Sequence, residues 1–261
     1  MTLLNATVGG VTTLTLNRPD VLNSFDDQLG HALLDAVREA SDDDATRCIV
    51  ITGEGRAFSA GEDLGALSDQ YRRGDVPDLG DTLTNRYNPL IRAIRAAPKP
   101  VVAAVNGVAA GAGASVALAC DFRVASEDAK LILAFIRVGL VPDSGALWFL
   151  SKMVGAARAL ELGASGRPID ARAGLELGLF SQVVPRDDFE ATYKAFASRL
   201  STMATAAFAL TKQLTNDALD RSLDEQLDAE VKAQSAAGRT EDHLEGVTAF
   251  FEKRDPEFHG R

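Results

Sequence analysis

The chain has 261 residues, enough for one large or two small domains, and its 46% hydrophobic residues can line a sizeable core. Its formal charge of −10 repels polyanions, and no stripe of lysines and arginines with interleaved aromatics offsets it, which argues against nucleic acid as a partner. No apolar stretch is long enough to span a bilayer, and the first residues carry no signal- or transit-peptide pattern. The sequence therefore predicts a cytoplasmic protein with no membrane partner.

Two cysteines, Cys48 and Cys120, lie within apolar runs and have no second Cys or His at metal-ligand spacing. This setting is typical of buried structural thiols. The sequence therefore predicts neither a disulfide nor a metal site, and it implies no redox cofactor.

In the first part of the chain, residues 11–16 alternate between apolar and polar as a strand does. A helix is expected to begin near Ser24, because Ser24 and Asp27 resemble a capping pair and an apolar residue recurs every four positions after them. Residues 48–52 form a continuous apolar run that predicts a buried strand.

From 65 to 86 the pattern weakens into a polar stretch with glycines and a proline, which we expect to be a mobile loop or lid. A helix is predicted around 90–94, followed by a buried strand at 101–105. Two further strands are expected at 122–125 and 182–184. This alternation favours an α/β core in which crossover helices cover parallel strands.

After about residue 185 the strand signal disappears and amphipathic stretches follow, including 204–219, 223–234 and 244–251. The last quarter of the chain is therefore expected to be helical. A helical tail on an α/β core often covers the site or joins subunits, and composition does not distinguish the two.

Two segments rich in small residues follow predicted strands, the usual place for backbone amides that bind a ligand. They are 56–64 (RAFSAGEDL) and 106–115 (NGVAAGAGAS). Small residues let a ligand approach the backbone, and a helix start presents unpaired N–H groups. Together the segments can form an oxyanion hole, although Gly/Ala-rich helices also pack tightly on sheets without any catalytic role.

The sequence resembles the enoyl-CoA hydratase/isomerase (crotonase) superfamily in four motifs, namely AFSAGEDL, AAVNGVAAGAGASVALACD, IRVGLVPDSGALWFL and EDHLEGVTAFFEKRDPEF. The resemblance implies a crotonase spiral core of ββα units at 1–195 and a helical C-terminal trimerisation region at 196–261. It also implies acyl-CoA thioester substrates, of which coenzyme A is a part, and a homotrimer or a dimer of trimers.

Transferred position by position, the resemblance assigns the two oxyanion-hole amides to Ala60 and Ala112. Each such donor lowers the barrier by about 3 kcal/mol when it stabilises charge on the thioester oxygen. The other residues that the resemblance assigns to substrate or CoA binding are Gly61, Glu62, Asp63, Leu64, Gly111, Phe135, Phe250 and Lys253. Relatives place the last two near CoA, sometimes across a subunit boundary.

The sequence departs from the hydratases of this family, which hold water between two glutamates. These positions are Ser115 and Phe135 here. Hydration needs one group to activate water and another to protonate carbon, and Phe135 can do neither. The remaining carboxylate is Asp143, at a position that resembles the acidic residue of the phenylacetate-pathway isomerases.

One carboxylate suffices to move a double bond, because it can remove a proton at one carbon and return it at another. A free aspartate, with a pKa of about 3.9, is a weak base at neutral pH, but burial raises it. Phe135, Leu140 and Trp148 can provide apolar surroundings for Asp143. An aspartate before a helix is also a common N-cap, so both roles stay open for Asp143.

The sequence thus favours an enoyl-CoA isomerase that shifts a double bond or rearranges an epoxide-derived acyl chain, with Asp143 as acid and base. Alternatives are an enoyl-CoA hydratase, an acyl-CoA hydrolase or dehalogenase that uses Asp143 as nucleophile, and a non-catalytic acyl-CoA binder. The acyl group cannot be read from the sequence.

Overall fold

Two β-sheets form the centre of the molecule in the computed structural model, which describes residues 1–261 apart from the side chain of Leu219. The larger sheet has the order β1-β2-β3-β5-β7-β10 and the smaller one β4-β6-β8-β9. The strands of the larger sheet are β1 (Leu3–Val8), β2 (Val11–Leu16), β3 (Cys48–Gly53), β5 (Val101–Val105), β7 (Phe122–Ser126) and β10 (Gln182–Val184). Those of the smaller sheet are β4 (Ala57–Ser59), β6 (Val108–Ala110), β8 (Lys130–Ile132) and β9 (Ile169–Asp170).

The chain alternates between the two sheets as it advances. It runs from β3 in the larger sheet to β4 in the smaller one and returns through helices to β5 in the larger sheet. It then passes to β6 in the smaller sheet, returns through a helix to β7 in the larger sheet, and enters the smaller sheet again at β8. From β2 to β10 the neighbours in the larger sheet are parallel, and only β1 pairs antiparallel, with β2. This is the spiral of ββα units that the sequence predicts.

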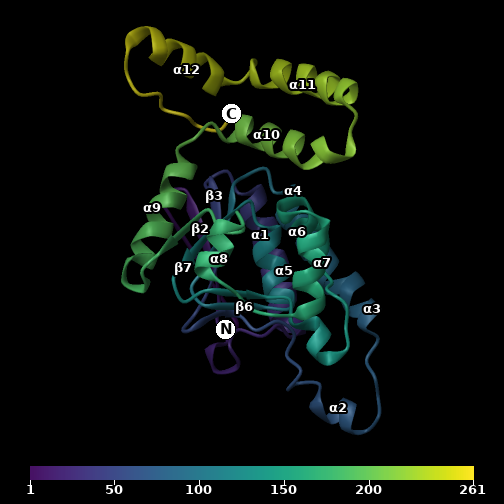
Figure 1. Ribbon diagram of the computed structural model, residues 1–261. Helices are drawn as coiled ribbons and strands as arrows, with labels where there is room; N and C mark the ends of the chain where they lie inside the picture. The colour runs from purple at the N-terminus through teal and green to yellow at the C-terminus, as the bar shows by residue number, and fades with distance from the viewer.

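Helices surround the sheets and form the C-terminal end of the chain (Figure 1). The longer helices of the core are α1 (Asp27–Asp42), α4 (Asn88–Ala96), α5 (Ala112–Ala119), α6 (Ala146–Val154), α7 (Ala156–Ser165) and α9 (Phe189–Ser201). The shorter ones are α2 (Ser68–Arg72), α3 (Leu79–Thr82), α8 (Ala171–Glu176) and single turns at Pro19–Val21, Ala134–Val138, Arg186–Asp188 and Ala218–Asp220. A π-turn (Leu83–Tyr87) joins α3 to α4.

The central strands and α5 make up the interior. Every residue of β5 and of α5 is buried, which explains why both read as continuous apolar or small-residue runs. One apolar cluster lies between the sheets and α1, α4 and α5, and a second one packs the larger sheet against α9. Helix α5 therefore has no solvent face, and its position is set by packing on all sides.

The predicted strands and the central helices are confirmed, but two local predictions are wrong. Helix α1 begins at Asp27, and its N-cap is Asp26, whose side chain accepts a hydrogen bond from the Leu29 N–H; Ser24 instead donates to the Val21 carbonyl. The segment 65–86, expected to be a polar loop, contains α2, α3 and most of the π-turn. Its polar residues are those of short, exposed helices.

The helices α10 (Thr205–Asp217), α11 (Leu223–Ala237) and α12 (Glu241–Glu252) stand apart at one end of the molecule (Figure 1). Lys212 attaches α10 to the core: its buried ammonium group donates to Asp121 at 2.9 Å and to the carbonyl of Ile94 at 3.0 Å. The expected division between 195 and 196 falls inside α9, which packs on the larger sheet. No helix among the described residues is long and apolar enough to cross a membrane.

Cys48 and Cys120 are buried free thiols, and burial raises the pKa of each to about 12, with the charge of Asp121 as a smaller cause. Because the thiolate is the reactive form, we expect neither thiol in the native protein to react with an aromatic disulfide reagent at pH 8. Titration of the unfolded protein should find both. Fast release of one equivalent from the folded protein would contradict this burial.

Candidate active site

The segments after β4 and β6 lie against each other. The strands β4 and β6 are parallel neighbours, so their carboxyl ends meet at one edge of the smaller sheet. Gly61 has a φ of +94°, and a Cβ there would lie 2.8 Å from the Ala110 carbonyl oxygen and 3.3 Å from the Ala112 nitrogen. Only glycine fits this conformation and this spacing.

The prediction that Ala60 supplies an oxyanion-hole amide is wrong, because its N–H donates to the Leu22 carbonyl at 2.9 Å. The N–H of Gly61 donates to the Ser59 hydroxyl, and that of Asp63 donates to the Phe25 carbonyl. Among the described residues, no acceptor is bonded to the N–H of Glu62. Glu62 therefore carries the free amide of this segment.

Ala112 is the first residue of α5, after Gly111 as N-cap, and no side chain caps the helix. The first N–H groups of a helix have no partner within it, and they add to the positive end of its dipole. The Ala112 amide thus stays a candidate donor. Glu62 follows Gly61 in the chain, and Gly61 lies close to the Ala112 nitrogen.

Asp143 lies in the turn between residues 134–138 and α6. The Ser144 hydroxyl donates to its carboxylate at 2.8 Å, and the Ser115 hydroxyl donates to its main-chain oxygen at 3.1 Å. Burial raises the pKa of Asp143, the Ser144 hydrogen bond lowers it, and the negative charge of Glu62 raises it. The carboxylate of Asp143 is therefore more basic than usual, and it lies near enough to Glu62 to be affected by its charge.

The alternative role of Asp143 as an N-cap is not supported. Helix α6 has Gly145 as its N-cap with no side-chain hydrogen bond, and only the main-chain oxygen of Asp143 accepts the Ala146 N–H. Ser115, at a position where the hydratases have a glutamate, instead ties the Asp143 turn to α5. The Asp143 carboxylate accepts the Ser144 hydroxyl and does not cap α6.

The apolar residues expected around Asp143 differ in their exposure. Phe135 is buried, and its carbonyl accepts the Leu140 N–H. This hydrogen bond closes the segment that precedes the Asp143 turn. Trp148 is 45% exposed, and its ring lies 3.8 Å from the Lys152 ammonium group. Phe135 is thus buried and Leu140 half-buried, whereas Trp148 faces solvent.

Glu62 has two partners that the sequence analysis missed. Arg86 contacts both of its carboxylate oxygens, at 2.7 and 2.6 Å, and the Tyr87 hydroxyl donates to one of them at 2.5 Å. Of the other predicted residues here, Asp63 pairs with Arg18 at 2.9 Å, and Leu64 is exposed. A partly buried glutamate needs a cation, but the burial of Glu62 is visible only in the structure, so the sequence carries no signal for Arg86.

Phe250 and Lys253 are not brought to these residues in the single chain. Both lie at the end of α12, at the opposite end of the molecule from α2 and β6 (Figure 1). Phe250 is 78% exposed, and Lys253 ends the helix with a φ of 56°. Within one chain they cannot contact a ligand bound at Glu62 and Ala112.

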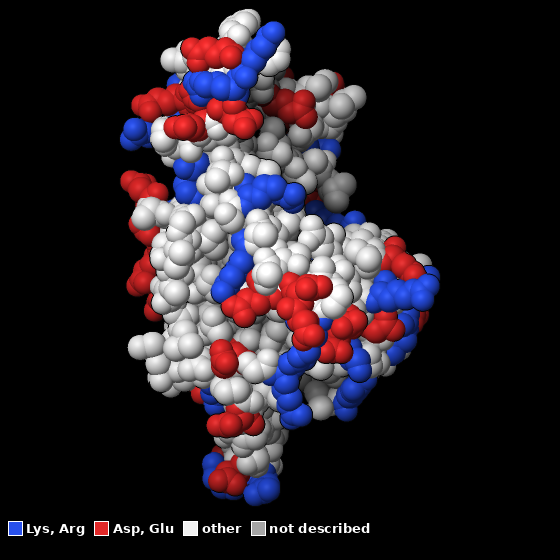
Figure 2. All heavy atoms as spheres, turned by 90° about the vertical axis from the view of Figure 1, so that its left-hand side faces the viewer, with Lys and Arg blue, Asp and Glu red and all other residues white. Residues whose placement is uncertain are grey.

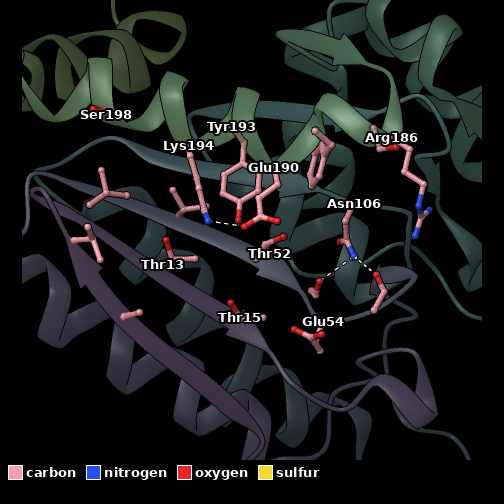
Figure 3. A pocket seen from close by; sticks show the side chains of 18 of the residues that line it. Thr13, Thr15, Thr52, Glu54, Asn106, Arg186, Glu190, Tyr193, Lys194 and Ser198 are labelled. Atoms are coloured by element: carbon pink, nitrogen blue, oxygen red, sulfur yellow. Dashed lines mark hydrogen bonds and ion pairs between the residues drawn. The ribbon is translucent and has the colours of Figure 1, made fainter.

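A groove of about 730 Å³ lies elsewhere, between the larger sheet and α9 (Figure 3). Thr13, Thr15 and Thr52 line it from the sheet, and Tyr193 and Lys194 from α9. Lys194 is paired with Glu190 at 2.5 Å. On the face of the molecule shown in Figure 2, acidic and basic side chains are interspersed. None of the predicted site residues is among those that line this groove.

No group of three or more His, Cys, Asp or Glu side chains in the described part of the chain is arranged to hold a metal ion. The residues described above offer the site one basic carboxylate and two backbone donors. This combination suits the removal of a proton next to a carbonyl group whose oxygen becomes negative.

Comparison with known proteins agrees with this geometry. The model of the enoyl-CoA hydratase/isomerase family matches residues 6–261. The chain belongs to this family. It is 43% identical to 1,2-epoxyphenylacetyl-CoA isomerase of Escherichia coli (strain K12) over 97% of this chain and 96% of that protein. A probable enoyl-CoA hydratase of Rhodobacter capsulatus is 42% identical over 97% of this chain and 95% of that protein.

Among solved structures, an enoyl-CoA hydratase from Bacillus anthracis superposes with a TM-score of 0.93 at 30% identity, covering 100% of both chains. These relatives confirm the crotonase fold and place the chain near the isomerase type. Family membership establishes an acyl-CoA hydratase/isomerase activity. It does not distinguish hydration from isomerisation, since the names of the relatives include hydratases as well as an isomerase.

Replacing Gly61 by Ala tests the contact between the two segments. The Cβ would collide with the Ala110 oxygen, so we expect a loss of about 1–3 kcal/mol in unfolding free energy and a large fall in kcat/KM on an enoyl-CoA. Gly74→Ala is the matched control, because Gly74 also has a positive φ but has no atom within 4 Å of the added Cβ. Equal effects of the two substitutions on kcat/KM would contradict the role of this contact.

Proposed function

We propose that this protein is an enoyl-CoA isomerase that shifts the double bond of an acyl-CoA thioester, or rearranges an epoxide-derived acyl chain. The observation that carries the proposal is the partly buried carboxylate of Asp143, which accepts the Ser144 hydroxyl, in a site where Ser115 and Phe135 occupy the positions of the hydratase glutamates. The similarity to an epoxyphenylacetyl-CoA isomerase supports it.

In the proposed reaction, the thioester oxygen of a 3-enoyl-CoA accepts hydrogen bonds from the N–H groups of Glu62 and Ala112. The Asp143 carboxylate removes a proton from C2, and the electron pair moves into a dienolate whose oxygen is held by the two amides. The Asp143 carboxyl group then returns the proton to C4, which leaves a conjugated 2-enoyl-CoA of unchanged mass. The two amides act mainly at the dienolate stage, when the oxygen is negative.

The proposed substrate contacts continue through Gly61, Asp63, Leu64 and Gly111 along CoA. Phe135 and Leu140 close the acyl side. Coenzyme A belongs to the substrate, and the proposal needs no metal or further cofactor.

Asp143→Asn tests the proposed base. Asn keeps the size of the side chain but cannot accept the proton, so we expect kcat to fall by about 10²- to 10⁴-fold while binding of the CoA thioester is retained. The assay follows the conjugated thioester's absorbance and the product mass from a 3-enoyl-CoA. Asp75→Asn, in the exposed segment between α2 and α3, serves as the control.

In the unaltered protein, kcat/KM should rise with pH through a pKa above the ordinary range of an aspartate, because the base works only when deprotonated and burial raises its pKa. Near-normal turnover by Asp143→Asn would refute the assignment. A product heavier by one water from a 2-enoyl-CoA would instead identify a hydratase.

We further propose that the protein works as a homotrimer or a dimer of trimers, in which Phe250 and Lys253 of one copy reach the CoA of another. Exposed apolar side chains on α11 and α12 support this, since patches of this kind mark contact surfaces. They are Leu223, Leu227, Val231, Leu244, Val247, Phe250 and Phe251.

Val231→Asp tests this assembly, because it places a charge on the apolar face of α11. We expect light scattering to give the mass of three or six chains for the unaltered protein and a smaller species for the variant. Val76→Asp is the control, because Val76 is similarly exposed but lies in the polar segment between α2 and α3. A monomeric unaltered protein would exclude the assembly.

A further inference from the structure

The π-turn Leu83–Tyr87 presents two buried polar residues to the site, Arg86 and Tyr87. Pro89 follows it and has no N–H, so the regular helical hydrogen bonding cannot continue through this point. Single π-turns inside helices are frequent at functional sites. Here the turn sets the directions of Arg86 and Tyr87, whose polar atoms both reach Glu62.

Arg86 is held in place from several sides. It is 3% exposed, its second terminal nitrogen contacts Asp27 at 3.1 Å, and its guanidinium lies 4.7 Å from the centre of the Tyr87 ring. Its stem crosses α1 at Gly30, where a Cβ would lie 2.5 Å from the Arg86 Cδ. Helix α1 therefore has a gap in its side chains at the point where the arginine passes.

This arrangement costs stability. The Nε of Arg86 is buried and has no acceptor among the described residues, and a buried unpaired donor is unfavourable. Tyr87 is also 3% exposed, and its ring packs edge-on against Phe25 with centroids 5.9 Å apart. A destabilising cluster around the Glu62 carboxylate, next to the proposed oxyanion hole, indicates a functional use for the cluster.

The contacts of Glu62 define what its side chain can do. Arg86 and Tyr87 occupy its carboxylate oxygens with three hydrogen bonds, so the carboxylate is a poor acceptor for a substrate proton. Its backbone, however, carries an N–H without an acceptor among the described residues, next to Gly61, which approaches the Ala112 nitrogen. Fixing the side chain restricts the rotation of the peptide that bears this N–H.

We propose that Arg86 and Tyr87 are positioning residues: by clamping Glu62 they hold its N–H in the oxyanion hole and keep a fixed negative charge facing Asp143. This inference rests on the proposed isomerase function. It assigns work to the side chains of Arg86, Tyr87 and Glu62, whereas Asp143 alone exchanges a proton with the substrate.

The titratable groups that face Asp143 are Glu62, from the segment after β4, and Tyr87, from the π-turn, with Arg86 acting through Glu62. The turn of Asp143 itself has no other titratable residue between 141 and 145, and Arg137 donates to the Gly166 carbonyl. The charge of Glu62 opposes ionisation of Asp143 and so keeps it basic.

Tyr87→Phe removes one hydrogen bond of the clamp and little else. With a 3-enoyl-CoA we expect kcat to fall on the order of ten- to a hundredfold, with KM nearly unchanged, because the displaced amide acts mainly on the dienolate. Tyr193→Phe is the matched control, since it removes the hydroxyl of another buried tyrosine, in α9. Thermal unfolding verifies that both variants fold, and equal kcat values for the two would overturn the proposal.

Glu62→Gln separates a positioning role from a merely structural one. Gln keeps the backbone N–H and an oxygen for Arg86 or Tyr87 but removes the charge, so the pKa of Asp143 should fall. The acid limb of kcat/KM should therefore move to lower pH, whereas Tyr87→Phe, which retains the charge, should leave the limb close to that of the unaltered protein. A limb that stays in place in a folded Glu62→Gln would overturn the electrostatic part of the proposal.

The unaltered protein distinguishes the two levels of inference. If it does not isomerise any 3-enoyl-CoA or epoxide-derived thioester, the proposed function fails before a variant is compared. If it isomerises the substrate and Tyr87→Phe matches Tyr193→Phe, only the positioning role fails.

Discussion

Neighbouring parallel strands end at the same edge of a sheet, and the pairing of β4 with β6 therefore sets Gly61 against the start of α5. Every feature of the site depends on this contact. It brings the residue before Glu62 close to the nitrogen of Ala112, and the Glu62 side chain is within reach of Arg86. Because α5 is buried on all sides, the segment that leads from β6 into α5 cannot move without disturbing the core.

Two carboxylates face the resulting space, and their surroundings differentiate them. Glu62 is paired with a guanidinium and a phenol, whereas the carboxylate of Asp143, which is partly buried, has only the Ser144 hydroxyl as a partner among the described residues. Burial without a cation makes a carboxylate basic, and a second negative charge adds to the effect. Proteins commonly give two carboxyl groups unequal environments, so that one stays a fixed charge while the other accepts a proton.

The sequence predicted the scaffold well, because buried parallel strands are continuous apolar runs and Val101–Val105 could hardly be anything else. It was weaker where several residues compete for one role, as at Ser24, Asp26 and Asp27, where the cap is the middle residue of the set. It placed the amide on Ala60, since a sequence does not show which N–H groups already have acceptors.

Asp143 could be singled out from the sequence because Ser115 and Phe135 occupy the positions where the hydratases have glutamates. The contact of Glu62 with Arg86 could not be predicted in this way. It joins residues 24 positions apart through a π-turn, and neither helical nor strand periodicity indicates such a turn. The separation of Phe250 and Lys253 from the site likewise depends on how the last three helices leave the core, which composition does not encode.

The π-turn also makes the site sensitive to the number of residues and not only to their identity. Successive residues of a helix point about 100° apart, so a deletion of one residue between Leu83 and Tyr87 would restore ordinary helical spacing and turn part of the clamp away from Glu62. Leu90 and Ile94 would stay in the core, and the fold would persist. A relative with the same arginine and tyrosine but one residue fewer would thus have the scaffold without the clamp, a difference that appears in an alignment only as a gap.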